Sequence, residues 1–226
     1  SVAEQILQNH IKGFQVIAFV KSIHNISINC IHFTKITRTH VDKFISRCPD
    51  VQVDKKIQQL FLKTKQKKDS LGGIICCVIK NCPPGLGDPV FDKLSSDLAK
   101  AMLSIPSCVG FEYGAGFSAT KVFGSENNDE FIVKNNKIRT KTNNSGGIQG
   151  GISNGELIYF NVAFKPIPTI MKPQNTITTS KQKIKLVPSG DYDICAVPRA
   201  VPIVESMASI VILDHYLKNK IYFHYK

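Results

Sequence analysis

A glycine-rich segment is the part of this sequence best suited to binding chemistry. It covers residues 144–155 and contains five glycines, Gly146, Gly147, Gly150, Gly151 and Gly155. Backbone N–H groups in such a segment can approach and cradle a phosphate. The spacing matches neither the GxxxxGK[ST] loop nor a strand–GxGxxG–helix arrangement. The pattern therefore leaves two interpretations open, an anion-binding loop and a flexible hairpin before the next strand.

Other reactive side chains give weaker signals. Lys165 ends an expected strand and could neutralise an anion, although lysine is common at strand ends. The 6 histidines show no HxxH or HExxH spacing, which predicts no zinc site. His215 falls on an expected helix near Asp214 and is interpreted as a structural residue. No Ser-His-Asp or Cys-His arrangement follows from the spacing.

The cysteines indicate a reducing compartment. There are 7 of them, an odd number, and none forms a CxxC pair. Cys76 and Cys77 are adjacent within an apolar run, where a free cysteine behaves as a small hydrophobic residue. These features argue against a disulfide framework.

Charge and composition restrict the class of partner. The 226 residues are 42% hydrophobic and 20% charged, which is typical of a globular protein. The formal net charge of +12 favours anionic partners, such as nucleic acid, an acidic membrane or small phosphorylated ligands. No apolar run approaches the roughly 20 residues of a membrane helix, and residues 1–10 do not resemble a signal peptide. We therefore expect no membrane partner.

Periodicity predicts the elements that must position these residues. Helices are expected at 2–11, 54–68, 91–105 and 201–217, and strands at 15–23, 72–80, 111–117 and 156–165. The third helix has one apolar stripe, made of Phe91, Leu94, Leu98, Met102 and Ile105. Because strands and helices alternate irregularly, we expect an α+β fold with antiparallel sheets.

The helix expected at 54–68 carries many lysines on one side. A nucleic-acid patch is one interpretation. We favour a solvated face, because no aromatic residues lie between the lysines to stack on bases.

Several motifs together resemble one family. In chain order they are Arg47-Cys48-Pro49-Asp50, Gly72-Gly73-Ile74, Pro84-Gly85-Leu86-Gly87-Asp88-Pro89-Val90-Phe91-Asp92, Ala99-Lys100-Ala101-Met102, Gly110-Phe111-Glu112-Tyr113-Gly114-Ala115-Gly116-Phe117, Gly124-Ser125-Glu126-Asn127-Asn128-Asp129, Thr142-Asn143-Asn144-Ser145-Gly146-Gly147-Ile148-Gln149-Gly150-Gly151-Ile152-Ser153-Asn154-Gly155, Lys165-Pro166, and Cys195-Ala196-Val197-Pro198-Arg199-Ala200-Val201-Pro202-Ile203-Val204-Glu205. This series resembles the middle and C-terminal parts of chorismate synthase and runs from near Val2 to Leu217.

The resemblance implies a fold, a reaction and partners. Residues 1–226 would form the C-terminal portion of a single domain, in which helices are sandwiched between antiparallel β-sheets. The family converts 5-enolpyruvylshikimate 3-phosphate to chorismate and phosphate with reduced FMN (FMNH2), and NADPH is required only where the enzyme reduces its own flavin. A cytoplasmic homotetramer is expected, or a plastid protein in a plastid-bearing eukaryote, with no nucleic acid and no membrane.

The resemblance also assigns roles to individual residues. Flavin contacts fall on Pro106, Ser107 and Gly150, and on the segment Lys165, Pro166, Ile167, Pro168 and Thr169. Asp193 matches an acidic residue near flavin and substrate, and it would handle protons there. A flavin- and substrate-binding arginine of the family corresponds to Asp191.

Two departures from the family pattern keep an alternative open. The family reads Gly-Arg-His-Asp-Pro-Cys where this chain reads Gly190-Asp191-Tyr192-Asp193-Ile194-Cys195, and a carboxylate cannot replace the arginine's bidentate anion binding. The family's Gly-Glu-Ser-His-Gly, Arg-Pro-Gly-His and Arg-Ser-Ser-Ala-Arg-Glu-Thr motifs, with two functional histidines, do not occur in these 226 residues. The chain also does not begin with Met, and we expect the segment that carries those motifs upstream of Ser1. The alternatives are a non-catalytic remnant or interaction module and a basic RNA-binding protein.

Overall fold

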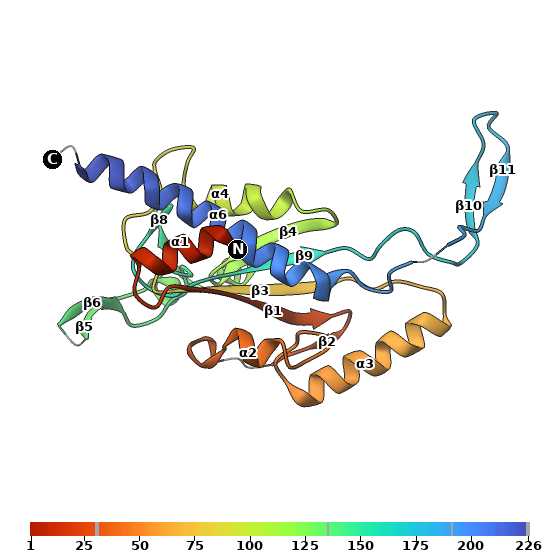
Figure 1. Ribbon diagram of the computed structural model, residues 1–226, viewed down its shortest axis with the longest axis horizontal. Coiled ribbons are helices and arrows are strands. Elements are labelled where there is room, and N and C mark those ends of the chain that lie inside the picture. The colour runs from red at the N-terminus through yellow and green to blue at the C-terminus, as the bar shows by residue number, and fades with distance from the viewer. Residues whose placement is uncertain (30–31, 135, 191, 225–226) are drawn as a thin grey trace.

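A five-stranded antiparallel sheet forms the centre of the molecule (Figure 1). The computed structural model describes residues 1–29, 32–134, 136–190 and 192–224. The strand order is β2 (Ile26–Ser27), β1 (Gln15–Ile23), β3 (Gly73–Lys80), β9 (Ile158–Phe164) and β4 (Cys108–Tyr113). Except for β1 and β2, neighbours in this order lie far apart in the chain, so the fold depends on long-range pairing.

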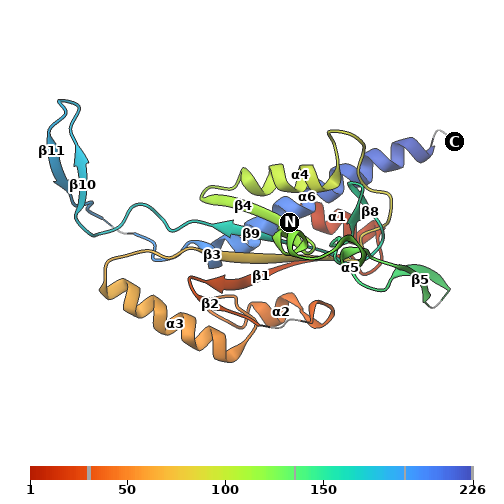
Figure 2. The ribbon, with the colours of Figure 1, turned by 180° about the vertical axis from the view of Figure 1, so that it is seen from behind.

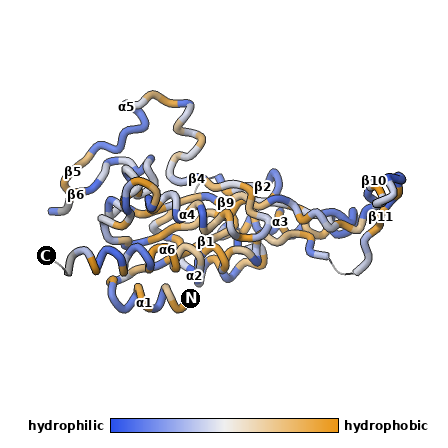
Figure 3. Tube along the Cα trace, turned by 90° about the horizontal axis from the view of Figure 1, so that it is seen from above, coloured by the Kyte–Doolittle hydropathy of each residue, from blue (hydrophilic) through white to orange (hydrophobic). Residues whose placement is uncertain are grey.

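The central strands are apolar on both faces. In β1 every residue from Val16 to Val20 is buried, and in β3 the same holds from Ile75 to Ile79. β1 pairs with β3 from Gln15 opposite Lys80 to Ile23 opposite Gly73, with one irregularity between Val20 and Ser22. Such continuous apolar runs form when both faces of a strand are covered. Hydrophobic residues accordingly concentrate along the middle of the molecule (Figure 3).

Three helices cover one face of the sheet. α1 (Val2–His10), α4 (Leu94–Leu103) and α6 (Val197–His224) contact one another or the strands beneath them. α4 points Leu94, Leu98 and Met102 into the core, and all three are fully buried. This period of about four residues is the apolar stripe of an amphipathic helix.

The helix α6 is longer than its sequence pattern predicted. It continues through Pro202 in its second turn. The missing N–H of Pro202 leaves the carbonyl of Pro198 without its helical donor, and this carbonyl accepts instead from Arg47 Nη1 at 3.1 Å. By length and composition α6 could cross a membrane, and it is the helix among the described residues that meets this test. The helix packs as a core helix does. It contacts α1, α4, β1 and β3, and it buries Val204, Ala208 and Ile212.

The chain between β1 and β3 runs along the β2 edge of the sheet. It forms a 3-10 turn (Phe33–Lys35), α2 (Arg38–Val41) and α3 (Val51–Gln66). Asp50 caps α3 by accepting hydrogen bonds from the N–H groups of Gln52 and Val53, both at 2.9 Å. The lysines of α3 are exposed.

Two hairpins extend away from the core (Figures 1 and 2). One pairs β5 (Phe131–Lys134) with β6 (Lys137–Thr140), and the other pairs β10 (Gln174–Ile177) with β11 (Lys183–Leu186). A third hairpin, β7 (Ile148–Gln149) with β8 (Ile152–Ser153), lies against the body of the molecule. A 3-10 segment (Gly116–Lys121) and α5 (Gly124–Asn127) complete the described elements.

The α+β class and the antiparallel pairing are confirmed, and so are β1 and β3 within one residue. Two details of the prediction were wrong. Phe91 lies in the loop that follows Pro89, because α4 begins only at Leu94. Its side chain therefore does not join the apolar stripe of the helix and is 88% exposed. The strand expected at 111–117 lies earlier, at Cys108–Tyr113, and is followed by a 3-10 segment.

Candidate functional site

Four chain segments meet where β9 ends. The N–H of Lys165 donates to the carbonyl of Ser107 at 3.0 Å, which continues the pairing of β9 with β4. The Oγ of Ser70 donates to the carbonyl of Ile167 at 2.6 Å. The N–H of Leu71 donates to the carbonyl of Ile194 at 2.8 Å. We call residues 106–107, 165–169 and 193 the strand-end group.

The strand-end group is polar and open to solvent. Pro106, Lys165, Pro166, Pro168 and Thr169 are exposed, and Ser107 and Ile167 are half-buried. The carboxylate of Asp193 pairs with the guanidinium of Arg199 through Oδ2 and Nη1 at 2.9 Å. A second ion pair, between Lys172 and Asp69, fixes the segment that follows. Asp191, the position of the family's arginine, lies outside the described residues.

Gly150 lies apart from the strand-end group. It is in the turn of the β7–β8 hairpin with a φ of +60°, and no heavy atom lies within 4 Å of where a Cβ would be. The carbonyl of the next residue, Gly151, accepts a hydrogen bond from the N–H of Leu94 at 2.8 Å, at the start of α4. Ser107 follows the end of α4. The two groups are thus separated by the length of α4, about 15 Å for ten residues.

A hollow of about 710 Å³ opens beside Gly150. Its walls come from α4, β4, the 3-10 segment and the glycine-rich segment, and include Ser95, Glu112, Phe117, Asn144 and Gln149. The carboxylate of Glu112 accepts from Asn161 Nδ2 at 2.8 Å and from the N–H of Phe117 at 3.2 Å. The volume is within the range of small-molecule sites.

A buried carboxylate that the sequence analysis missed holds the wall of this hollow. Asp129 is 3% exposed and accepts hydrogen bonds from Thr142, Asn144 and Ser145. Burial on its own raises the pKa of Asp129, but the hydrogen bonds from Ser145, Thr142 and Asn144 outweigh it and leave this pKa below its ordinary value. In the sequence, Asp129 appears as the last residue of the motif Gly124–Asp129, to which no role was assigned.

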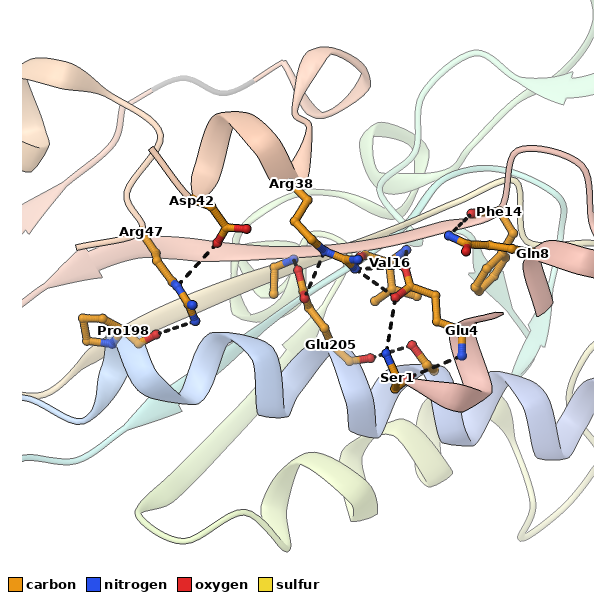
Figure 4. A network of polar contacts seen from close by, with 12 residues as sticks. Ser1, Glu4, Gln8, Phe14, Val16, Arg38, Asp42, Arg47, Pro198 and Glu205 are labelled. Atoms are coloured by element: carbon orange, nitrogen blue, oxygen red, sulfur yellow. Dashed lines mark hydrogen bonds and ion pairs between the residues drawn. The ribbon is translucent and has the colours of Figure 1, made fainter. Parts of the chain in front are cut away.

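A second polar network, in which Glu4 is buried and Arg38 is exposed, joins α1, α2, β1 and α6 (Figure 4). The guanidinium of Arg38 lies 2.9 Å from Glu4 Oε1 and 3.4 Å from Glu205 Oε2. Glu4 and Glu205 also accept from the N–H groups of Val16 and Ala18, at 3.2 and 2.8 Å. Burial raises the pKa of Glu205, while the Ala18 N–H and Arg38 oppose that rise. This network stabilises the packing of the helices on β1.

The contacts and burial of His215 and of the buried cysteines indicate that these residues have structural roles. His215 is buried, and its Nε2 lies 2.9 Å from Asp97 Oδ2 of α4, so its partner is Asp97 rather than Asp214. Within the described parts of the chain, no cluster of three or more His, Cys, Asp or Glu could hold a metal. Burial raises the pKa of the Cys48, Cys76 and Cys82 thiols to about 12, which keeps them protonated.

Comparison with known proteins assigns this chain to a family. The family model described as chorismate synthase matches residues 1–217. The chain belongs to the chorismate synthase family.

Relatives and a solved structure agree with this assignment. The chain is 48% identical over 220 residues to the chorismate synthase of Gloeothece citriformis, covering 97% of this chain and 60% of that protein. It is 45% identical to the chloroplastic chorismate synthase of Capnoides sempervirens, covering 96% of this chain and 49% of that protein. A crystal structure of chorismate synthase matches with a TM-score of 0.80 and 30% identity, over 96% of this chain and 61% of the other. The chain thus spans about half to three-fifths of the length of these relatives.

The structural match confirms the chorismate synthase-like α+β fold. Of the residues expected to contact flavin, the structure brings Ser107 next to Lys165 and places Gly150 at the other end of α4. Asp193 is linked to this group indirectly. The carbonyl of the next residue, Ile194, accepts from the N–H of Leu71, and the neighbouring Ser70 donates to the carbonyl of Ile167.

Proposed function

We propose that this chain takes part in the reduced-FMN-dependent elimination of phosphate from 5-enolpyruvylshikimate 3-phosphate, which yields chorismate. The observation that carries the proposal is the hydrogen bond between Lys165 and Ser107, which joins two segments to which the family resemblance assigns flavin contacts. Membership of the chorismate synthase family supports the same reaction. The net charge of +12 suits reduced FMN and 5-enolpyruvylshikimate 3-phosphate, which both carry several negative charges.

The residues present fit an anionic, planar cofactor. Lys165 is exposed at a strand end, and among the described residues it forms no ion pair. Gly150 is exposed in a positive-φ turn with open space over its backbone, which leaves room for a ligand to approach closely. We propose that the strand-end group and the glycine-rich turn hold reduced FMN.

The roles of the side chains follow from their charges. Reduced FMN, held by the strand-end group and the glycine-rich turn, would supply reversible electron donation to the elimination of phosphate, and the reaction would have no net redox change. The ammonium of Lys165 attracts the anionic part of a ligand. The Oδ2 of Asp193 is bound by Arg199, so we assign proton handling to its Oδ1.

The partners and the location of the protein are also proposals. We propose a homotetramer, which fits the exposure of Phe91, Phe117, Phe123 and Phe131 on the described surface. NADPH enters only where the protein reduces its own flavin. The relative from Capnoides sempervirens is named a chloroplastic enzyme, which supports a plastid location. We propose a cytoplasmic location as the alternative, with no nucleic-acid or membrane partner.

One observation favours a second candidate, a chorismate-synthase scaffold without catalysis. Asp191 places a negative charge at the position of the family's anion-binding arginine, which reverses the local interaction with phosphate. Arg199 follows in the sequence, but its guanidinium is paired with Asp193.

The test is anaerobic turnover of 5-enolpyruvylshikimate 3-phosphate by the purified chain with chemically reduced FMN. Chorismate formation is measured by chromatography, with the Gloeothece citriformis enzyme as the working control. Appearance of chorismate supports the proposed reaction. A folded chain that yields none, while the control is active, favours the non-catalytic scaffold.

A further inference from the structure

Asp129 organises the segment that leads into the glycine-rich turn. Each of its two oxygens accepts two hydrogen bonds. Oδ1 accepts from Thr142 Oγ1 at 2.6 Å and from the N–H of Asn144 at 2.7 Å. Oδ2 accepts from the N–H of Ser145 at 2.8 Å and from its Oγ at 2.5 Å. A carboxylate that accepts four hydrogen bonds is fully satisfied although it is buried.

The fixed segment in turn supports its neighbours. The carbonyl of Asn144 accepts from the N–H of Ala115 at 2.7 Å, which joins it to the corner after β4. Gly114 is required at this contact, because a Cβ there would lie 2.1 Å from the same carbonyl oxygen. The carbonyl of Ser145 accepts from the N–H of Ile148, the first residue of β7, at 3.3 Å. A single carboxylate therefore fixes the glycine-rich wall of the hollow, its junction with the corner after β4, and the base of the β7–β8 hairpin.

We propose that Asp129 is a positioning residue for the flavin site, because it holds the glycine-rich hairpin and its Gly150 turn in the conformation that receives the ligand. This inference rests on the proposed function, which assigns Gly150 to the flavin. Asp129 itself faces the backbone and hydroxyl groups of residues 142–145. Its effect on the ligand is therefore indirect.

The chain offers a matched control for a change at Asp129. Asp54 is also a buried carboxylate, 5% exposed, and accepts from the N–H and Oγ of Ser46 and from Gln58 Nε2. It lies on α3, which contacts β2 at the edge of the sheet. Asp129→Asn and Asp54→Asn make the same chemical change in similar surroundings, one beside the glycine-rich segment and one remote from it.

The experiment is titration of the chain and both variants with FMN, followed by flavin fluorescence, together with thermal unfolding and amide hydrogen exchange. Asparagine replaces one accepting oxygen by a donor, so at least two of the four bonds are lost. We expect Asp129→Asn to weaken FMN binding roughly tenfold or more, the factor that matches one lost charge-assisted hydrogen bond. Amides 144 and 145 should exchange faster, while amides of β1 keep their protection. Asp54→Asn should leave the FMN affinity unchanged even where it lowers the unfolding temperature.

Each outcome decides the inference. Equal FMN affinity in Asp129→Asn and the unvaried chain overturns it, and so does an equal loss in Asp54→Asn, which would indicate a purely structural effect. Should Asp129→Asn fail to fold, Ser145→Ala removes only the hydroxyl donor, and a loss of roughly tenfold in FMN affinity is expected from one charge-assisted hydrogen bond to the Asp129 carboxylate. An unvaried chain that binds no FMN refutes the proposed function itself, and the inference with it.

Discussion

The two ends of α4 differ in how their backbone is held. At the end that begins with Leu94, the glycine-rich segment is fixed by the buried Asp129 and by close backbone contacts. At the other end, the strand-end group is exposed or half-buried. Lys165 forms no ion pair among the described residues, and Asp193 pairs with the solvent-exposed Arg199. We infer that the proposed ligand is bound by a prearranged turn at one end and by an adaptable charged surface at the other. It also predicts that equivalent substitutions will have unequal effects at the two ends.

The largest expected effect is the substitution Gly114→Ala. Gly114 has a φ of +57°, and an added Cβ would lie 2.1 Å from the carbonyl oxygen of Asn144. We expect the free energy of unfolding to fall by roughly 3 kcal/mol, because the strained backbone and the clash act together. Urea unfolding followed by circular dichroism measures this loss.

Gly124 provides the control for that substitution. It has no heavy atom within 4 Å of its added Cβ. Gly124→Ala should change the unfolding free energy by less than about 0.5 kcal/mol, as for an ordinary surface change. Equal losses in the two variants would show that the glycine-rich end is not closely packed.

An intermediate effect is expected in the pH dependence of stability. The pKa of Asp129 is lowered in the folded chain, so its contribution is present above the pKa of the unfolded carboxyl, near 3.8, and is lost as the pH falls through the folded value. Between pH 5 and pH 3, roughly the range in which an Asp carboxyl titrates, the unvaried chain should lose more unfolding free energy than Asp129→Asn does.

Glu205 should behave in the opposite sense. Its pKa is raised by burial, so its contribution is present below the unfolded value, near 4.5, and is lost as the pH rises through the folded value. Glu205→Gln should therefore gain stability relative to the unvaried chain as the pH rises through that range. Urea unfolding at several pH values tests both variants, and parallel pH profiles for all three proteins would contradict the account.

The smallest effect is expected for Arg199→Ala, which removes the ion-pair partner of Asp193 in the strand-end group. The side chain of Arg199 is 75% exposed, and an exposed ion pair contributes at most about 1 kcal/mol. We expect a change in unfolding free energy below about 0.5 kcal/mol at moderate salt, where screening is strong. A loss as large as that of Gly114→Ala would mean that the strand-end group is as rigid as the glycine-rich end.

The sequence predicted those elements whose hydrophobic pattern is local. β1 and β3 are continuous apolar runs, and Leu94, Leu98 and Met102 repeat at helical spacing, so each was found within a few residues. The hairpin of β10 and β11 was not predicted, because its low hydrophobicity gives no core-facing pattern. Lys165 and Gly150 were assigned flavin contacts through their motifs, and these contacts stay a prediction.

The residues that organise the site were harder to predict. Asp129 bonds to partners 13 to 16 residues away, and Glu205 pairs with Arg38 and the N–H of Ala18 from the opposite end of the chain. Neither role follows from periodicity or from local spacing. The separation of Gly150 from the strand-end group likewise depends on how α4 lies between β7 and β4.

The most direct test of the proposed flavin site is anaerobic titration with reduced FMN of the unvaried chain, Lys165→Glu and Lys56→Glu. Lys165 lies in the strand-end group, whereas Lys56 is an exposed lysine of α3, so both variants change the net charge equally. The account predicts that Lys165→Glu weakens binding roughly tenfold through local repulsion of the anionic ligand, while Lys56→Glu stays within about twofold of the unvaried chain. Equal affinities for all three proteins, or no binding by the unvaried chain, would contradict it.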